Sequence, residues 1–485
     1  MRKVCGAGGR DLIVQFIGES LIYTTLAMLI AMALVELLLL PWLNAFVDRS
    51  IVFEYWRWPL LPYLAGTVLV VGTLAGAYPA FVLSSFRPGV VLKGTGPSVA
   101  GSGRVRQLLV IVQFAILIGL MLSTAIIYRQ TQFGLDRGLR FDKDQLLIVN
   151  VRSAECEKSS FRTAVGSLPG VLGAACSEFF LGEYGTAQYI APDGREVTLK
   201  DGIAGAGMFE LMGLKPVAGR FFMRDRELDS LPPPKDRKPG VPIRIVLNET
   251  AAKVLGFKSP ADAIGKSLAL ARTDVRYEII GVVADFSGES VRQGIYPMYY
   301  FNTAGWLSRL NVRLRGSAVP ETLRAIDKLW NQIPGQTRPI SRRFYDEYVQ
   351  SIYASLIRQR TIFAGFAMVA LLLAGLGLFG LAGFTVERRT REIGIRKAMG
   401  AETGDVTRLL MWQFAKPVLW ANVLAWPVAG YIMYRWLLGF AYRIDLEPWP
   451  FAAASLVALV IAMLTVSTHS ILVARAKPVA ALRYE

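Results

Sequence analysis

Six apolar stretches constrain this 485-residue chain more than any other feature of its sequence. A helix needs about 20 predominantly apolar residues to cross the hydrocarbon core of a bilayer. Stretches of that length lie at residues 20–43, 60–84, 107–128, 361–386, 409–436 and 449–473. Hydrophobic residues make up 53% of the sequence, which is typical of a membrane protein. We therefore expect a polytopic α-helical membrane protein with about six transmembrane helices.

Basic residues at the ends of these stretches indicate which side of the membrane each end faces. Six cationic side chains lie between Arg388 and Arg408, and further clusters precede the first stretch, separate the second from the third and follow the sixth. Basic residues are retained on the cytoplasmic side. Loops 44–59 and 437–448 and the long segment 129–360 are therefore expected to face outward. That segment is rich in arginine too, but long domains translocate largely regardless of charge.

The net charge of +17 raises the question of nucleic-acid binding. The cations that cluster lie at the ends of apolar stretches, where lipid headgroups and membrane topology account for them. No basic and aromatic recognition motif accompanies them. We therefore expect contact with membrane lipid and no nucleic-acid partner.

The long outer segment has the pattern of a mixed α/β domain. Runs rich in β-branched residues, bounded by turn residues, predict strands at 145–151, 243–247 and 277–283. Helical spacing of apolar residues predicts helices at 159–167 and 320–333. The proline-rich run 231–240 (LPPPKDRKPG) predicts a loop. The fold class expected is thus a helical membrane protein with one large α/β extracytoplasmic domain.

Two of the three cysteines, Cys156 and Cys176, fall in this outer segment, and Cys5 falls in an expected cytoplasmic segment. The first two can form a bridge if the domain is exported. Two cysteines alone do not make a disulfide framework, however. We therefore expect two free, buried thiols.

An internal repeat indicates a duplicated unit. A shift of 394 residues pairs Arg2, Lys3, Gly6, Ala7, Asp11, Ala27, Ala31, Trp42, Leu43 and Phe46 with Arg396, Lys397, Gly400, Ala401, Asp405, Ala421, Ala425, Trp436, Leu437 and Phe440. The second copy is preceded by a helix, an outer domain and another helix, whereas only Met1 precedes the first. We expect the C-terminal one and a half modules of a duplicated membrane protein. The missing opening was either lost from the reading frame, which we favour, or is supplied by another polypeptide.

Segment 387–401 (ERRTREIGIRKAMGA), between a glycine-rich apolar helix and a second apolar helix, resembles the membrane subunit of MacB/FtsX-like ABC transporter permeases. Segments 209–221 (FELMGLKPVAGRF), 246–265 (VLNETAAKVLGFKSPADAIG) and 281–286 (GVVADF) are similar to the periplasmic core domain of the MacB family. The resemblance covers nearly the whole chain. It implies the second half of a first permease module at 1–95, a transmembrane helix at 104–128, a MacB-like periplasmic core domain at 129–357 and an FtsX-like permease domain at 358–485.

In that family a short cytoplasmic segment, here 387–408, docks on a separate ATPase. The resemblance therefore implies an ABC-type ATPase partner and no catalytic activity in this chain. The implied docking residues are Arg2, Lys3, Gly6, Ala7, Asp11, Glu387, Arg388, Glu392, Gly394, Arg396, Lys397, Gly400, Ala401 and Asp405. Two alternatives stay open, namely an ordinary basic loop beside a helix and, for Arg396 and Lys397, anchoring to lipid headgroups.

Other kinds of site are not indicated by the sequence. Residues 264–267 (IGKS) resemble the end of a phosphate-binding loop, but Pro260 stands where that motif needs glycine. His469 is the only histidine and lies near the expected inner end of the last apolar stretch, which excludes a histidine metal cluster and, elsewhere in the chain, a Ser-His-Asp triad. We expect no catalytic, cofactor or metal site.

Small and charged residues inside the apolar stretches need separate weighing. Ridges of small residues let helix backbones approach closely, and here we expect them to pack modules together. Buried charges in lipid are costly and so are functional candidates, but three scattered ones do not make a proton or ion relay. The ridges are Gly72, Gly76 and Ala80, and Gly375, Gly377, Gly380 and Gly383; the charges are Glu19, Glu36 and Lys416.

A mechanism follows from these parts. Residues 346–360 have helical spacing with no Gly or Pro before the fourth stretch, which predicts one stiff rod shared by outer domain and membrane. We expect residues 402–410 to form a short amphipathic helix in the ATPase groove. Closure of the ATPases would then reshape the outer domain, a process that the family calls mechanotransmission.

Two functions remain open. One is export or extraction of a substrate from the outer face of the bacterial inner membrane, driven by the partner ATPase and assisted by a periplasmic adaptor. The other is signalling, in which the same stroke activates an extracytoplasmic hydrolase or sensor. A further partner is implied by the repeat, namely a second permease or the missing N-terminal half.

Overall fold

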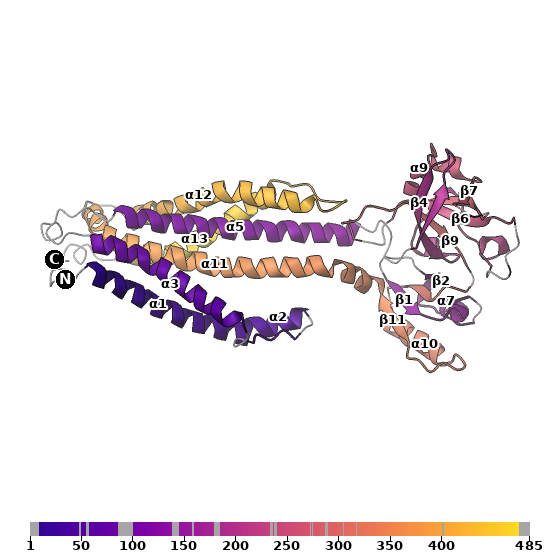
Figure 1. Ribbon diagram of the computed structural model, residues 1–485, viewed down its shortest axis with the longest axis horizontal. Helices are drawn as coiled ribbons and strands as arrows, with labels where there is room; N and C mark the ends of the chain where they lie inside the picture. The colour runs from indigo at the N-terminus through magenta and orange to yellow at the C-terminus, as the bar shows by residue number, and fades with distance from the viewer. Residues whose placement is uncertain are drawn as a thin grey trace. The chain divides into compact units, whose positions relative to one another are not determined.

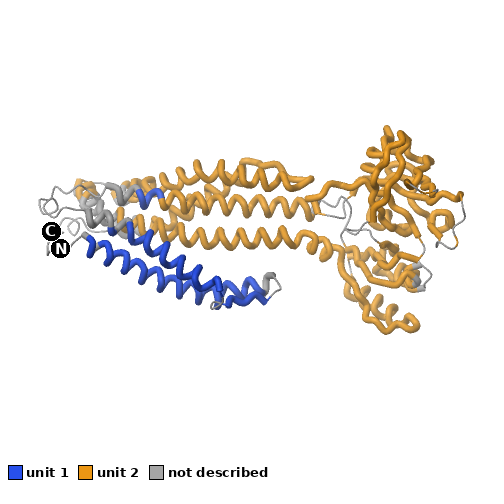
Figure 2. The backbone as a smooth tube through the Cα atoms, viewed as in Figure 1, with its two compact units in different colours: residues 1–108 blue, residues 109–485 orange. Residues whose placement is uncertain are grey.

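The computed structural model divides the chain into two compact units, Met1–Leu108 and Leu109–Glu485 (Figure 1, Figure 2). Each unit is described by itself. The residues described are 9–47, 50–54, 58–85, 100–137, 145–157, 160–178, 185–232, 236, 240–271, 273, 275–286, 290–303, 305–316, 318–399 and 402–474.

The first unit is built around a helical hairpin. Helix α1 (Gly9–Leu34) continues through a π-helical turn (Val35–Leu39) into α2 (Leu40–Val47), and α3 (Leu60–Ser85) runs back along α1. The π-helical turn contains Glu36, so the backbone of α1 departs from regular α-helix at one of the charged positions in the apolar stretches. None of the described side chains of α1 is buried and more than half of them are exposed, as expected for a helix that faces lipid.

The second unit contains four long helices, α5 (Ala100–Arg137), α11 (Tyr345–Ala398), α12 (Thr403–Leu437) and α13 (Trp449–Ala474). Their shared core joins large and small side chains, including Phe114, Ile118, Leu378, Val418 and Ala458. Small residues let the backbones approach. A Cβ atom at Gly119 of α5, for example, would lie 3.7 Å from Cβ of Ala429 on α12.

Among the residues that the structure describes, five helices are long and apolar enough to cross a membrane: Ile13–Asn44, Leu60–Ala77, Val105–Leu135, Tyr345–Thr385 and Trp449–Ser467. The expected stretch 409–436 lies within α12, which is long enough but contains tryptophans, tyrosines, Pro417, Asn422 and Pro427 that lower its hydropathy. The predicted fold class is confirmed, a polytopic helical membrane protein with a large α/β domain.

Helix α11 is a single element of 54 residues. At about 1.5 Å per residue it is roughly 80 Å long, more than twice the thickness of a hydrocarbon core. The part before the apolar run buries Tyr345, Val349, Tyr353 and Leu356, a stripe at helical spacing, against the outer domain. The rod predicted from residues 346–360 is therefore present.

The outer domain consists of eleven described strands and short helices. The strands are β1 (Leu146–Asn150), β2 (Val171–Glu178), β3 (Thr186–Ile190), β4 (Glu196–Ala204), β5 (Pro216–Gly219), β6 (Ile243–Asn248), β7 (Ser267–Leu270), β8 (Arg276–Val283), β9 (Met298–Phe301), β10 (Arg309–Leu314) and β11 (Ser341–Phe344). The helices are α6 (Ser153–Glu157), α7 (Ser160–Gly166), α8 (Met208–Leu211), α9 (Glu249–Val254) and α10 (Val319–Asn331), with 3₁₀ turns at Glu227–Asp229 and Pro260–Ala263.

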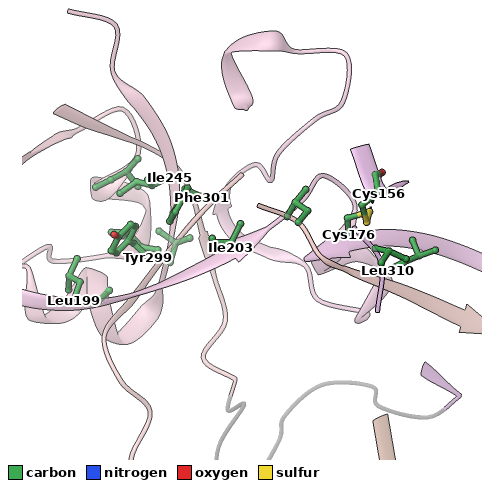
Figure 3. Packing of buried hydrophobic residues seen from close by; sticks show 14 of the residues in the cluster. Cys156, Cys176, Leu199, Ile203, Ile245, Tyr299, Phe301 and Leu310 are labelled. Carbon is green, nitrogen blue, oxygen red and sulfur yellow. Dashed lines mark hydrogen bonds between the residues drawn. A yellow bond between two sulfur atoms is a disulfide. The ribbon is translucent and has the colours of Figure 1, made fainter. Parts of the chain in front are cut away.

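The described strands form one sheet in the order β11-β1-β10-β2-β4-β3-β7-β8-β6-β9, with β5 beside β8. An additional parallel pairing of β4 with β9 closes six of the strands into a ring. Inward-facing residues of the ring, among them Leu199, Ile203, Tyr299, Ile245 and Phe301, form its core (Figure 3). Strands β1, β2, β10 and β11 make a second lobe, and the chain segment of the ring is inserted between β2 and β10.

The strands and helices predicted in the outer segment all occur, with boundaries that differ by one or two residues. The domain limits differ more. Helix α5 continues to Arg137 and α11 already begins at Tyr345, so the first and last strands of the outer domain lie at 146 and 344, inside the expected limits of 129 and 357. Both ends of the domain are therefore helical stems. Of the proline-rich run 231–240, residues 233–235 and 237–239 lie outside the described part.

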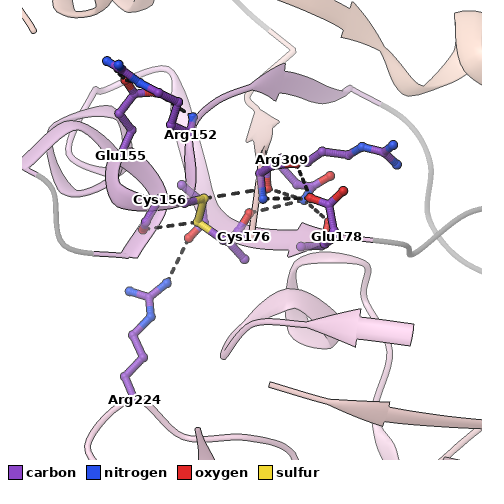
Figure 4. Close-up of a disulfide and its surroundings, with 12 residues drawn as sticks. Arg152, Glu155, Cys156, Cys176, Glu178, Arg224 and Arg309 are labelled. Atoms are coloured by element: carbon purple, nitrogen blue, oxygen red, sulfur yellow. Dashed lines mark hydrogen bonds and ion pairs between the residues drawn. A yellow bond between two sulfur atoms is a disulfide. The ribbon is translucent and has the colours of Figure 1, made fainter. Parts of the chain in front are cut away.

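The prediction of two free thiols is wrong. Cys156 of α6 and Cys176 of β2 form a disulfide, with their Cα atoms 6.0 Å apart (Figure 4). Both residues are buried in the core of the β1-β2-β10-β11 lobe, where α6 lies against β10. Disulfides persist in oxidising compartments, and the bond therefore agrees with the outward orientation expected for this domain.

We expect removal of the bond by Cys156→Ser together with Cys176→Ser to cost about 2–4 kcal/mol of outer-domain stability, because the bond closes a loop of 20 residues. Thiol labelling in a Cys5→Ser background measures the bond directly. The denatured chain should take up no maleimide before reduction and two after it. Labelling of the denatured chain without reductant would show that the two thiols are free.

Candidate functional site

The candidate docking segment lies where one long helix ends and the next begins, a place that we name the docking turn. Helix α11 extends through Glu387, Arg388 and Gly394 to Ala398, and α12 begins at Thr403 with Glu402 as its N-cap. The side chains of Glu387, Arg388 and Lys397 are not among those described. The described part of the segment is thus mostly helix.

Described side chains of the segment are exposed and combine charge with apolar surface. Arg396 donates to Glu392 one turn earlier, with Nη2 and Oε1 2.7 Å apart. Ile395 and Met399, at the same helical spacing, are 46% and 83% exposed. A methionine at a helix end with most of its surface exposed is a feature that partner-binding surfaces often have.

The start of α12 corrects one expectation. Residues 402–410 do not form a separate short helix, because α12 continues without interruption from Thr403 to Leu437. Asp405 is exposed in its first turn, where a negative charge complements the helix dipole, and its backbone N–H donates to the Glu402 carbonyl. Gly400 and Ala401 lie outside the described residues. Any force applied at this turn therefore acts directly on two long helices.

The docking residues expected in the first repeat copy are described only in part. Arg2, Lys3, Gly6 and Ala7 lie outside the described residues. Asp11 lies in the first turn of α1, the position that Asp405 occupies in α12. The two aspartates thus occupy the same helical position in the two copies of the repeat.

Three glycines of the small-residue ridges contact a neighbouring helix of their own unit. Gly72, Gly76 and the buried Ala80 lie on α3 against α1 of the same hairpin, and a Cβ atom at Gly76 would be 3.0 Å from the Ile17 Cα. On α11, a Cβ at Gly377 would lie 2.2 Å from Oε1 of Gln113 on α5, whereas Gly375, Gly380 and Gly383 have open space beside them. Gly377 alone of these four therefore marks a close helix contact.

The charged residues in the apolar stretches are dispersed. Glu19 accepts a hydrogen bond of 2.7 Å from Gln15 on the same helix, Glu36 lies in the π-helical turn, and Lys416 is exposed on α12. Across the described part of the chain, no group of three His, Cys, Asp or Glu side chains lies close enough together to hold a metal ion.

A contact that sequence reasoning missed joins the outer domain to the outer end of the α12–α13 pair. The loop after α12 places Ala441 and Tyr442 beside Val291 and Arg292 of the outer domain. The Ala441 N–H donates to the Arg292 carbonyl at 3.3 Å, and the Tyr442 N–H donates to the Val291 carbonyl at 3.1 Å. Phe440 is buried beneath them, with the Arg292 guanidinium 5.0 Å from its ring centre.

Two buried polar side chains from the stems complete this contact. Gln130 of α5 is 0% exposed; its Nε2 donates to the Tyr442 carbonyl at 2.9 Å, and its Oε1 accepts from the Ile444 N–H at 3.0 Å. Tyr353 of α11 accepts from the Val291 N–H at 3.1 Å. We name the set Gln130, Val291, Arg292, Tyr353 and 440–444 the outer clamp.

An ion pair flanks the clamp. Arg129 lies 3.0 Å from Glu447, and its guanidinium is 5.2 Å from the Trp449 ring centre. Hydrogen bonds from Arg129 and then from the Trp449 indole hold the pKa of the Glu447 carboxyl below its ordinary value. The only available sequence signal for the clamp was the presence of polar Gln130 and Tyr353 on otherwise apolar helix faces.

Two protein-family models match parts of the second unit. The chain matches the family described as MacB-like periplasmic core domain over residues 111–329 and the family described as FtsX-like permease C-terminal over residues 364–478.

Among curated proteins, it is 26% identical over 187 residues to the pyoverdine export ATP-binding/permease protein PvdT of Pseudomonas aeruginosa, covering 34% of this chain and 27% of that protein. It is 24% identical over 249 residues to the macrolide export ATP-binding/permease protein MacB 2 of Aeromonas hydrophila, covering 49% of this chain and 36% of that protein. The chain thus spans about a third of the length of these relatives.

Two solved structures are similar to the outer domain. The periplasmic region of MacB from Actinobacillus actinomycetemcomitans is 15% identical, with a TM-score of 0.31, and the match covers 44% of this chain and 94% of that one. The extracellular domain of the transporter YknZ from Gram-positive bacteria is 13% identical, with a TM-score of 0.29, and the match covers 41% of this chain and 98% of that one.

The outer clamp predicts a specific cross-link. A Cβ atom at Gly294 would lie 3.9 Å from the Ala441 Cβ, which is within the range that disulfides require. We expect Gly294→Cys with Ala441→Cys, in a Cys5→Ser background, to bridge under mild oxidation, as measured by proteolysis between the two positions followed by non-reducing electrophoresis. Each single variant is the control.

Gln130→Ala should lower the yield of this cross-link, since it leaves the buried Tyr442 carbonyl and Ile444 N–H without their partner, at a cost of about 1–3 kcal/mol. Gln132→Ala on the same helix is the matched control. An unchanged yield with Gln130→Ala would contradict the role assigned to Gln130.

Proposed function

Because this chain belongs to the MacB/FtsX-like permeases of ABC transporters, we propose that it is a membrane subunit that transmits the work of a separate ATPase to its own outer domain. The observation that carries the proposal is helix α11, whose 54 residues join the docking turn to the first turn packed against the outer domain. No hinge residue interrupts residues 346–360, so an axial displacement at one end reaches the other.

The docking residues proposed are those of the turn and its flanks. Arg396, Lys397 and Asp405 supply charges of both signs at the ends of α11 and α12, and the exposed Ile395 and Met399 supply apolar surface between them. A partner that approaches this turn would contact both helices at once. Arg2, Lys3, Gly6 and Ala7 are proposed to make the equivalent contact in the first repeat copy.

The outer clamp is proposed as the second mechanical connection. Helix α12 begins at the docking turn, and the loop that follows its outer end is hydrogen-bonded to Val291 and Arg292 of the outer domain. A relative displacement of α11 and α12 would therefore be applied to the outer domain at two points. Unequal displacements at two points of attachment would rotate the domain. A single rod would not determine such a rotation.

A second permease segment is proposed as a partner of the first unit. The repeat pairs Ala421 and Ala425, which are buried in the core of α5, α11, α12 and α13, with Ala27 and Ala31, which are exposed on α1. We propose that the alanine face of α1 is covered by helices that correspond to α5 and α11, from another permease chain or segment.

The substrate is proposed to be exported or extracted from the outer face of the bacterial inner membrane. The printed names of the relatives support this choice over signalling, since they are export proteins for pyoverdine and macrolides. The relatives are named ATP-binding/permease proteins, whereas we propose that the ATPase of this system is a separate subunit.

Charge reversal tests the docking proposal. Arg396→Glu with Lys397→Glu should abolish copurification of the ATPase encoded with this chain, because both changes place negative charge at the docking turn. Arg324→Glu with Lys328→Glu on α10 is the matched control, since it reverses the same number of cations at exposed positions outside the docking segment. Full ATPase recovery with the double variant would refute the docking role.

A helix break in α11 tests the transmission proposal. Ser355→Pro, at an exposed position, removes a backbone hydrogen bond and kinks the helix at a cost of about 3 kcal/mol. We expect the variant to retain its ATPase but to lose transport in reconstituted vesicles. Ser355→Ala should behave as wild type. Transport at the wild-type rate by the proline variant would show that α11 does not carry the force.

A further inference from the structure

A cavity of about 450 Å³ lies where the second lobe of the outer domain meets the start of α11. Its lining comes from β1, β10, β11 and the first turn of α11. Three of the lining residues are arginines, Arg309, Arg342 and Arg343, and none of the lining residues is acidic.

Sheet register explains why these side chains converge. Ile148 on β1 lies opposite Arg343 on β11, and Asn150 on β1 lies between Ser341 on β11 and Arg309 on β10. Residues directly opposite one another in an antiparallel sheet project from the same face. The edge of the lobe therefore presents two adjacent rows of hydrogen-bond donors rather than isolated surface cations.

The two arginine side chains on the cavity face are Arg309 and Arg343. Arg342 lies opposite Val149, so its side chain projects from the other face of the sheet, where it donates to Asp327 and to the Leu323 carbonyl of α10. The Arg343 guanidinium lies 4.9 Å from the ring centre of Tyr348 on α11. The Asn150 amide donates to the Ser341 hydroxyl at 3.0 Å, which leaves the hydroxyl proton free to be directed at a ligand. Side chains positioned in this way lose little entropy when an anion binds.

The cavity lies beyond the lipid headgroups. Thirteen residues of continuous helix separate Tyr348 from Thr361, where the apolar run of α11 begins, which corresponds to about 20 Å. The Arg360 guanidinium, 5.2 Å from the Tyr128 ring centre, marks the level of the outer interface. Headgroups extend roughly 5–8 Å from the hydrocarbon core. A lipid resting in the bilayer therefore does not reach the cavity.

We propose that this cavity binds the anionic group, phosphate or a phosphate ester, of a small molecule or of an amphiphile that has been lifted out of the membrane. Guanidinium groups match the geometry of phosphate oxygens, and the apolar surface of Ile148 and Tyr348 suits the adjoining part of an amphiphile. The proposal goes beyond the transmission of force and names a ligand class. Its cavity touches α11, so a ligand there would contact both the sheet and the helix.

Calorimetric titration of the full chain in an uncharged detergent, without ATPase, tests this proposal. The probes are inorganic phosphate, dihexanoylphosphatidylglycerol and, as zwitterionic control, dihexanoylphosphatidylcholine. We expect at least one of the two anionic probes to bind at least tenfold more tightly than the control lipid. Binding of inorganic phosphate identifies a free anion site, and binding of the anionic lipid alone identifies an amphiphile site.

Variants locate the binding. Arg309→Gln and Arg343→Gln should each weaken the binding about tenfold, as loss of one charge-assisted hydrogen bond does. Arg324→Gln on α10 removes the same charge at an exposed position outside the cavity lining and should change the affinity less than twofold. Arg343 is exposed, so its variant keeps the fold even where Arg309→Gln does not.

Three results would overturn the proposal: no binding of either anionic probe, equal affinity for the zwitterionic lipid, or equal affinity in wild type and Arg343→Gln. Because no ATPase is present in the titration, these results would leave the docking and transmission proposals standing. Loss of ATPase copurification would in turn leave the anion site unaffected.

Discussion

Backbone hydrogen bonding in α11 is the constraint on which the rest of the molecule depends. Inside a bilayer no water is available, and every peptide group must be bonded within its own helix. Outside the bilayer that obligation ends, and a helix continues only where packing or propensity favours it. Here Tyr345, Val349, Tyr353 and Leu356 bury one face of the extension. The stiffness of the rod in water therefore depends on its contact with the outer domain, and the two elements respond to force as one body.

The outer clamp gives this body a second support. Tyr353 is part of α11 and also of the outer clamp. Its ring packs on α5, where a Cβ atom at Gly134 would lie 2.4 Å from it, and its hydroxyl accepts from the Val291 N–H. A side chain larger than glycine at position 134 would displace the ring from the clamp. Helices α5 and α11 and the outer domain thus meet at one tyrosine, and Val291 in turn accepts from the Tyr442 N–H of the α12–α13 loop. Packed contacts of this kind change between discrete arrangements rather than bending continuously.

The sequence predicted features that repeat locally and missed those that depend on distant pairing. Apolar stretches, strand runs and the uninterrupted 346–360 segment were readable because side-chain periodicity is local. The Cys156–Cys176 bond was not, because only the fold brings α6 beside β2. Gln130 and Tyr442 are 312 residues apart, and the row that joins Arg309, Asn150 and Ser341 exists only in the register of three strands. The docking turn was found through resemblance and repeat, but its continuity with α12 required the structure.

The position of the cationic cavity couples ligand binding to the position of helix α11. Tyr348 lines the cavity and is followed directly by Val349 of the buried stripe of α11, so a displacement of the helix changes the cavity wall. If a displacement of α11 changes the affinity of the cavity for an anion, binding of that anion changes the free energy of the displacement by the same amount. Binding energy at the outer domain would then bias the position of α11, and with it the docking turn. If α11 transmits force as proposed, the same reciprocity would let an anion in the cavity act on the docking of the proposed ATPase partner.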